Sequence, residues 1–179
     1  MKKLLLASML IFTPLTEASA LPEALQNIAA VQKADARVIT SGLPTPAEFD
    51  SLARSGVNVV INLMPDSSND SYHNEAQLVQ AAGMEYVYIP VDWQHPTIDD
   101  VNRFFAAMLN HQNQDILIHC KANYRASAFY YLYEVTQLGK NPQASMQHTM
   151  APWGDIERSL QQYPQWQQLI NQVLAQYDQ

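Results

Sequence analysis

Short apolar runs bounded by turn residues alternate along this chain with segments of helical periodicity. The clearest run, V-N-V-V-I-N-L at Val57–Leu63, is rich in β-branched residues, as expected of a buried strand. The other predicted strands are Arg37–Thr40, Met84–Val91 and Asp115–His119. The alternation predicts a single α/β domain with a four- to five-stranded, mainly parallel sheet flanked by helices.

Capping signals mark where the predicted helices begin. Thr45 with Glu48, and Thr97 with Asp100, have the spacing of a capping box. The segment Leu21–Ala34 is predicted as a short helix or a semi-ordered lead-in. The remaining predicted helices are Thr45–Ser55, Glu75–Ala82, Thr97–His111 and Arg125–Leu138, followed by C-terminal pieces at Pro142–Met150, Asp155–Gln161 and Pro164–Tyr177.

The first twenty residues have the features of a secretory signal peptide. Lys2 and Lys3 form a basic end, Leu4–Phe12 is an apolar run of nine residues, and Ala18-Ser19-Ala20 is a small-residue cleavage signal. Nine residues are about half of the ~20 that a membrane-spanning helix needs. We therefore expect residues 1–20 to be removed, and 21–179 to be exported to the periplasm or the medium without stable membrane insertion.

The exported part is acidic and suits one domain. The chain has 10 Lys and Arg and 17 Asp and Glu residues; without Lys2, Lys3 and Glu17, residues 21–179 keep 8 basic and 16 acidic ones, a net charge of −8. Such a surface repels polyanions, which excludes nucleic acid as a partner. Any anion-binding site must therefore be local.

One local site is predicted in the stretch I-L-I-H-C-K-A-N-Y-R-A-S at Ile116–Ser127, where a strand runs into a helix. The only cysteine of the chain, Cys120, lies in the turn, and Arg125 follows it by five positions. Backbone N–H groups at such a turn converge on one point, and the helix N-terminus adds partial positive charge. The residues of this predicted oxyanion-binding loop are Lys121, Ala122, Asn123 and Tyr124.

The turn suits a nucleophilic reaction on an oxyanion. The loop and Arg125 would favour the thiolate of Cys120, which is the reactive form. A guanidinium can also grip two oxygens of a tetrahedral oxyanion at once. Attack of Cys120 on a bound phosphoryl group would give a phosphocysteine, which water would then release.

The leaving oxygen of such a reaction needs a proton, and Asp92 is the first candidate to supply it. Asp92 follows a strand predicted to be parallel to the cysteine strand, so it should emerge at the same edge of the sheet. Fixing a turn is its alternative role. Asp99 and Asp100 rank lower because acids are common in a first helical turn, and Asp66 and Asp70 could contribute only if the polar loop Met64–Asn74 folds over the site.

Two further residues are candidates for supporting roles. His119 precedes the cysteine and could orient the loop, although a lone histidine is more often structural. Ser127 could donate a hydrogen bond to the thiolate, or simply belong to the first helical turn. No spacing of histidines, cysteine and carboxylates resembles a metal site, and we predict neither a metal nor a cofactor.

The turn resembles the signature loop of the cysteine-dependent protein tyrosine and dual-specificity phosphatases, through His119-Cys120, Arg125 and Ser127. The run Y-V-Y-I-P-V-D, ending at Asp92, is similar to the general-acid region of the dual-specificity enzymes. The segments I-T-S-G-L-P-T-P and V-N-V-V-I-N-L resemble a bacterial phosphatase-like family related to the beta-lactamase-hydrolase-like proteins. The resemblance covers Arg37 to Gly139 and implies a phosphatase fold, with 141–178 as additional helices.

The sequence departs from the phosphatase signature in two ways. That signature has five residues between cysteine and arginine, whereas this chain has four, and Asn123 stands where the family usually has glycine. A four-residue spacer also resembles that of rhodanese-type sulfurtransferases. The resemblance thus implies a phosphatase acting on a phosphorylated small molecule or phosphoprotein, with sulfur transfer or a phospho-ligand binding module as alternatives.

Overall fold

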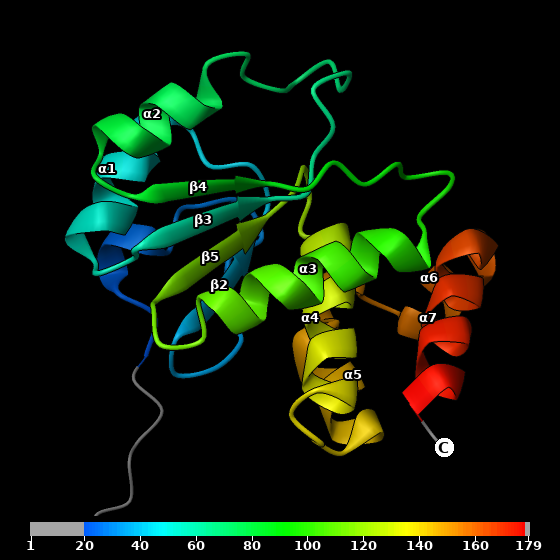
Figure 1. Cartoon of the computed structure of the whole chain (residues 1–179). Coiled ribbons are helices and arrows are strands. Elements are labelled where there is room, and N and C mark those ends of the chain that lie inside the picture. The colour runs from blue at the N-terminus through cyan, green and yellow to red at the C-terminus, as the bar shows by residue number, and fades with distance from the viewer. Residues whose placement is uncertain (1–19, 178–179) are drawn as a thin grey trace, which may run out of the picture.

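The structure of the protein, a computed structural model, describes residues 20–177 (Figure 1). Apart from Ala20, the predicted signal peptide lies outside the described residues. Within the described part of the chain, no helix is both long and apolar enough to cross a membrane.

The domain is built on a five-stranded sheet with the strand order β1-β2-β5-β3-β4. The strands β2, β5, β3 and β4 are parallel, and β1 pairs antiparallel with β2 at one edge. The predicted α/β fold with a mainly parallel sheet is therefore confirmed. The strands are β1 (Gln32–Lys33), β2 (Val38–Ser41), β3 (Val59–Asn62), β4 (Glu85–Tyr88) and β5 (Ile116–His119).

Helices cover both faces of the sheet (Figure 1). Side chains alternate between the faces, so that Leu117 packs with α1, α2 and η1, while Ile116 and Ile118 pack with α3, α4 and the C-terminal helices. The helices are η1 (Glu23–Leu25), α1 (Pro46–Arg54), α2 (Glu75–Ala81), α3 (Ile98–Asn110), α4 (Tyr124–Thr136), α5 (Pro142–Thr149), η2 (Ala151–Trp153), α6 (Ile156–Gln162) and α7 (Pro164–Tyr177).

The helix α4 is the central helix of the domain and is buried from Arg125 to Glu134. The sheet covers one side of it, and α3, α5, α7 and η2 cover the others. A helix buried all round needs no polar face, which explains why its sequence has little amphipathic periodicity.

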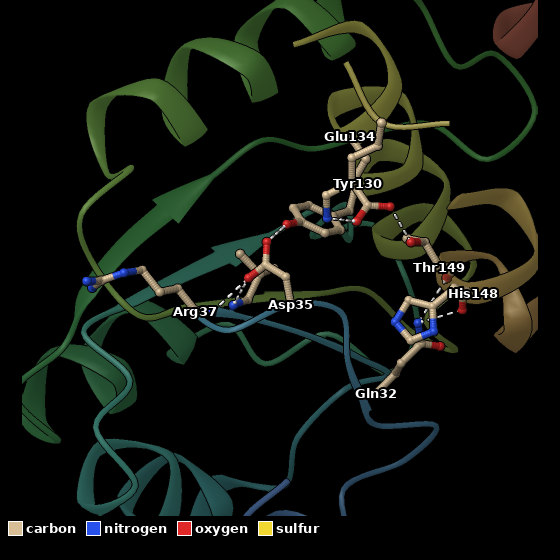
Figure 2. A network of polar contacts seen from close by, with 9 residues as sticks. Gln32, Asp35, Arg37, Tyr130, Glu134, His148 and Thr149 are labelled. Atoms are coloured by element: carbon tan, nitrogen blue, oxygen red, sulfur yellow. Dashed lines mark hydrogen bonds and ion pairs between the residues drawn. The ribbon is translucent and has the colours of Figure 1, made fainter. Parts of the chain in front are cut away.

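A network of polar contacts ties α4 to the N-terminal segment (Figure 2). The Tyr130 hydroxyl donates to a carboxylate oxygen of Asp35, whose other oxygen accepts the N–H groups of Arg37 (2.8 Å) and Val38 (2.9 Å). The buried Glu134 accepts the Thr149 hydroxyl. The bonds of Asp35 lie at the amino end of β2, and the bond of Glu134 joins α4 to α5.

The structure differs from the predicted elements mainly at Leu21–Ala34. The predicted short helix is present but covers only Glu23–Leu25 as η1, and the strand β1 at the end of this segment was not predicted. A strand of two residues is too short to show an alternation of apolar and polar side chains in the sequence. Only its pairing with β2 identifies β1 as a strand. Elsewhere the predicted strands and helices are present, with shifted ends: α4 begins at Tyr124, and β4 is shorter than Met84–Val91.

Candidate active site

The predicted nucleophile lies in a tight turn between β5 and α4. The turn runs from Cys120 to Asn123, and Asn123 has the left-handed conformation (φ 65°) that asparagine tolerates better than most residues. Its side-chain amide donates to Ala30 O (2.7 Å) and Thr40 Oγ1 (3.1 Å). Asn123 thus both turns the chain into α4 and fixes the turn to the N-terminal part of the domain.

The segment that follows β2 holds the same turn from the side. Cys120 N–H donates to Ser41 O (3.3 Å), and Leu43 N–H donates to Lys121 O (3.2 Å). A Cβ atom on Gly42 would lie only 2.9 Å from Lys121 O and 3.0 Å from Ala29 O. Glycine is therefore required at this position for the close approach of the two backbones.

Cys120 and Arg125 line one cavity of about 190 Å³ at the N-terminus of α4. The Cys120 residue is 1% exposed and Arg125 is 9% exposed. Although Arg125 comes one residue earlier than in the phosphatase signature, it still reaches the cavity that contains the thiol. The other lining residues are Trp93, Lys121, Ala122, Tyr124 and Tyr163.

The Arg125 guanidinium forms no direct salt bridge within residues 20–177, and its Nε atom has no hydrogen-bond partner there. Its Cζ atom lies 5.4 Å from the centroid of the Trp93 ring, so the aromatic face is its main neighbour. A buried cation that makes no direct contact with a carboxylate is costly unless an anion can approach it. The cavity is thus suited to an oxyanion.

Aromatic side chains form the wall of the cavity. The Trp93 ring lies 4.9 Å from that of Tyr163, 5.0 Å from Trp166 and 6.0 Å from Tyr124. The carbonyl oxygen of Trp93 accepts hydrogen bonds from Trp166 Nε1 (3.0 Å) and Gln165 Nε2 (3.2 Å). The helix α7 therefore anchors the loop that carries Trp93 and its neighbour Asp92.

Asp92 follows β4 on this loop, with 64% of its side chain exposed. Its Oδ1 accepts the N–H groups of Gln94 (2.7 Å) and His95 (3.1 Å). These two bonds hold the pKa of Asp92 below its ordinary value, and the charges of His95 and Arg125 act in the same direction. Asp92 thus fixes a turn, which was the alternative role predicted for it. It is also close enough to Arg125 for the two charges to interact.

His119 points to the face of the sheet opposite the α4 side and is completely buried. Its Nε2 atom lies 2.9 Å from Oε1 of Glu75, the first residue of α2, which is 2% exposed. The prediction noted His119 but not its partner. Glu75 looks from the sequence like an ordinary acidic residue in a first helical turn.

One residue of the predicted oxyanion-binding loop, Lys121, contacts the polar segment 64–74. The ammonium of Lys121 forms an ion pair with the carboxylate of Asp70. The segment thus touches the outer side of the turn, but none of its residues lines the cavity that contains Cys120, so the condition stated for Asp66 and Asp70 is not met. Asp66 contributes a backbone contact instead, since its N–H donates to the Tyr88 hydroxyl (2.8 Å).

Ser127 supports the turn rather than the thiol. Its hydroxyl donates to Asn123 O (2.6 Å) and accepts a hydrogen bond from Trp153 Nε1 (3.2 Å). Because the hydroxyl proton of Ser127 is donated to Asn123 O, the predicted hydrogen bond from Ser127 to the thiolate is not formed. Asp100 is likewise engaged elsewhere, in the capping box with Thr97.

Three residues at the site were missed from the sequence: Trp93, Tyr163 and Glu75. Trp93 adjoins the candidate acid, and that adjacency was the only local signal. Tyr163 comes from the junction of α6 and α7, and nothing in the sequence links that junction to Cys120. Among residues 20–177, no group of three or more His, Cys, Asp or Glu side chains is placed to hold a metal ion.

Comparison with known proteins agrees with this geometry. The sequence model of the family described as "DSP-PTPase phosphatase fused to NAD+ Kinase" matches residues 15–162. The chain belongs to this family. The predicted relationship to the dual-specificity phosphatases is therefore confirmed. The matched region ends just before Tyr163.

Curated relatives include the Beta-lactamase hydrolase-like proteins of Xylella fastidiosa and Agrobacterium fabrum, which are 35% and 33% identical over 102 residues. The match covers 55% of this chain and 23% of theirs, so the chain spans about a quarter of the length of these relatives. The predicted link to the beta-lactamase-hydrolase-like group is therefore confirmed for the matched part.

Solved structures share the fold over most of the chain. The DUF442 protein of Shewanella putrefaciens CN-32 is 53% identical, with a TM-score of 0.79 over 87% of this chain and 95% of that one. TpbA of P. aeruginosa, solved in complex with pTyr, has a TM-score of 0.61 at 16% identity, covering 88% of this chain and 95% of its own. At that identity the likeness to TpbA concerns the fold alone.

Proposed function

We propose that the protein hydrolyses phosphate monoesters through a phosphocysteine intermediate on Cys120. The observation that carries this proposal is the buried Arg125, which forms no direct salt bridge within residues 20–177 and lines the same cavity as the thiol. Membership of the DSP-PTPase family supports it. The oxyanion would be held by Arg125 and by backbone N–H groups between Lys121 and Tyr124.

In the first step, the thiolate of Cys120 attacks phosphorus, the S–P bond forms and the bond to the leaving oxygen breaks. Asp92 is proposed to give its proton to that oxygen. In the second step, water attacks phosphorus and gives a proton to the Asp92 carboxylate, and the S–P bond breaks. The products are the alcohol, inorganic phosphate and the original thiolate.

Aryl phosphates are the substrate class that we propose. The side chains of Trp93, Tyr124 and Tyr163 surround the approach to the thiol, and aromatic rings favour an aryl group by stacking. A cavity of about 190 Å³ is below the usual size of a pocket for a drug-sized ligand, so only the phosphoryl group and an adjoining ring would enter it. The pTyr ligand of TpbA belongs to this class.

The mechanism is tested by comparing the wild type with Cys120→Ser on 4-nitrophenyl phosphate, and with Asp92→Asn on phenyl phosphate, whose leaving group needs a proton and which Asp92→Asn should therefore hydrolyse more slowly. We expect Cys120→Ser to lose turnover, because a neutral hydroxyl cannot replace the thiolate. Equal turnover of wild type and Cys120→Ser would rule out the covalent mechanism. Thiocyanate release from thiosulfate and cyanide, without phosphate release, would favour sulfur transfer, which the four-residue spacer also fits.

Arg125→Lys tests the oxyanion site itself. A lysine keeps the charge but cannot form two parallel bonds, so inhibition by inorganic phosphate should weaken by about tenfold or more. The exposed Arg158 provides the matched control, and Arg158→Lys should leave inhibition unchanged. Equal inhibition of Arg125→Lys and wild type would exclude Arg125 from the site.

We also propose that the mature protein acts outside the cytoplasm, on a phosphorylated small molecule or phosphoprotein. This rests on the basic, apolar and small-residue segments of the first twenty residues. Mass spectrometry of the protein recovered from its native host should give a chain that starts at Leu21. A chain that keeps Lys2 and Lys3 would contradict export by this route.

A further inference from the structure

A buried pair of titratable side chains lies directly beneath the nucleophile and has no role in the mechanism above. His119 is 0% exposed and Glu75 is 2% exposed, and their contact of 2.9 Å joins the end of β5 to the start of α2. Within residues 20–177, His119 Nδ1 and Glu75 Oε2 have no hydrogen-bond partner. The single contact between them is therefore the only side-chain hydrogen bond that either residue makes in the described structure.

His119 is placed so that its side chain controls the start of the nucleophile turn. Its carbonyl oxygen accepts Leu63 N–H from the β3 side (2.9 Å), and the next residue, Cys120, donates to Ser41 O on the β2 side (3.3 Å). The imidazole and the thiol project to opposite faces of the sheet. A movement of the ring would therefore be transmitted through one peptide unit to the thiol.

Loss of the Glu75 carboxylate would leave a fully buried imidazole without a partner. An unpaired buried donor is costly, which favours a rotation of the ring towards water. Because β2 and β3 flank the strand end, such a rotation has to displace the turn at Cys120.

Glu75 is not needed to hold the polar segment 64–74 in place. Met64 N–H donates to Asn62 Oδ1 (2.7 Å), Asp66 N–H donates to the Tyr88 hydroxyl (2.8 Å), and Asp70 pairs with Lys121. These contacts attach the segment along its length. The buried carboxylate at its end is thus available for a role towards His119.

We propose that Glu75 is a positioning residue, which fixes the His119 ring and through it the reactive position of Cys120. The inference rests on the proposed function, because it concerns the same thiol. The Glu75 side chain reaches neither substrate nor thiol, and it acts only through the hydrogen bond to His119.

The test uses Glu75→Met, which keeps the side-chain volume without a good acceptor, and Glu75→Gln, which keeps an acceptor oxygen. The matched control is Glu134→Met, since Glu134 is also 2% exposed but belongs to the opposite end of α4. For each variant, kcat on 4-nitrophenyl phosphate and the inhibition constant of inorganic phosphate are measured, with thermal unfolding in parallel. If Glu75→Met does not fold, Glu75→Ser replaces it, because serine is well tolerated at a helix start.

We expect Glu75→Met to lower kcat by about tenfold to a hundredfold, as supporting partners of reactive groups typically do. Inhibition by phosphate should change by less than about threefold, because Arg125 and the loop N–H groups still bind the anion. Glu75→Gln should restore kcat to within about threefold of wild type, and Glu134→Met should lose stability with unchanged kcat.

The inference is overturned by an unchanged kcat in Glu75→Met, or by a Glu75→Gln variant as slow as Glu75→Met. A parallel loss of phosphate binding and kcat would also overturn it, since that result indicates collapse of the loop. A wild type without turnover refutes the proposed function and this inference together. An active wild type with unaffected Glu75 variants refutes the inference alone.

Discussion

Asp92 has an exposed carboxylate that is nevertheless bound by two backbone N–H groups. Those bonds, from Gln94 and His95, keep the pKa of Asp92 below its ordinary value, so it is ionised at neutral pH in the free protein. A general acid must carry a proton. A bound phosphate dianion would raise the pKa of a nearby carboxylate, because like charges disfavour ionisation.

Because Asp92 must be protonated to act as the acid, its contribution to turnover should depend on the pH and on the leaving group of the substrate. As the pH falls from about 7 to about 5, the protonated fraction of a carboxyl with a lowered pKa increases. Turnover of an alkyl phosphate should therefore rise relative to that of 4-nitrophenyl phosphate, whose leaving group needs no proton. The ratio of the two rates is measured against pH; it should be flat in Asp92→Asn, and a flat ratio in the wild type would exclude Asp92 as the acid.

The loop between β4 and α3 owes its position to a helix that is distant in sequence. Trp166 on α7 is fully buried and donates to the carbonyl oxygen of Trp93. Trp166→Phe removes this donor, and we expect a loss of stability of about 1–3 kcal/mol together with a lower kcat, because the loop that carries Asp92 becomes less fixed.

Phe104→Leu on α3 is the control for this effect. Phe104 is equally buried and packs against Phe129 in the core, so its truncation should lower stability without a comparable change in kcat. Denaturant unfolding and steady-state kinetics are measured on both variants. If both lose stability and neither loses activity, α7 does not position the loop.

Sequence reasoning predicted the elements where local pattern and packing agree. The run at Val57–Leu63 and the capping boxes at Thr45 and Thr97 correspond to β3, α1 and α3. The turn with Cys120 and Arg125 was also predicted, because its residues are contiguous. Tyr163 and Glu75 could not be predicted, since each reaches the site only through tertiary packing. The strand β1 was not predicted for the same reason, because it is formed only by its pairing with β2.

Across the whole molecule, the cavity at Cys120 lies at the N-terminal end of α4, whereas the polar network around Tyr130 and Glu134 lies along its middle and C-terminal part. Burial raises the pKa of Tyr130, so its hydroxyl stays protonated and donates to Asp35 throughout the neutral range. Tyr130→Phe removes this bond, and we expect it to cost about 1–2 kcal/mol of stability with unchanged kcat.

Tyr133→Phe is the matched control on the same helix, because the Tyr133 hydroxyl forms no hydrogen bond within residues 20–177. Its stability should stay close to that of the wild type. Thermal unfolding and kinetics on 4-nitrophenyl phosphate test both variants. A large fall in kcat for Tyr130→Phe would show that the polar network and the cavity are coupled.

The contacts of Ala29 and Ala30 have a consequence for where a functional unit of this chain can start. Their carbonyl oxygens accept hydrogen bonds from Gly42 N–H and from the Asn123 side chain, and both donors support the nucleophile turn. A fragment cut at Arg37, where the resemblance to the phosphatases starts, would keep every strand of the parallel sheet. It would nevertheless lose the two carbonyl groups that hold the nucleophile turn, so we expect the shortest active fragment to begin upstream of Ala29.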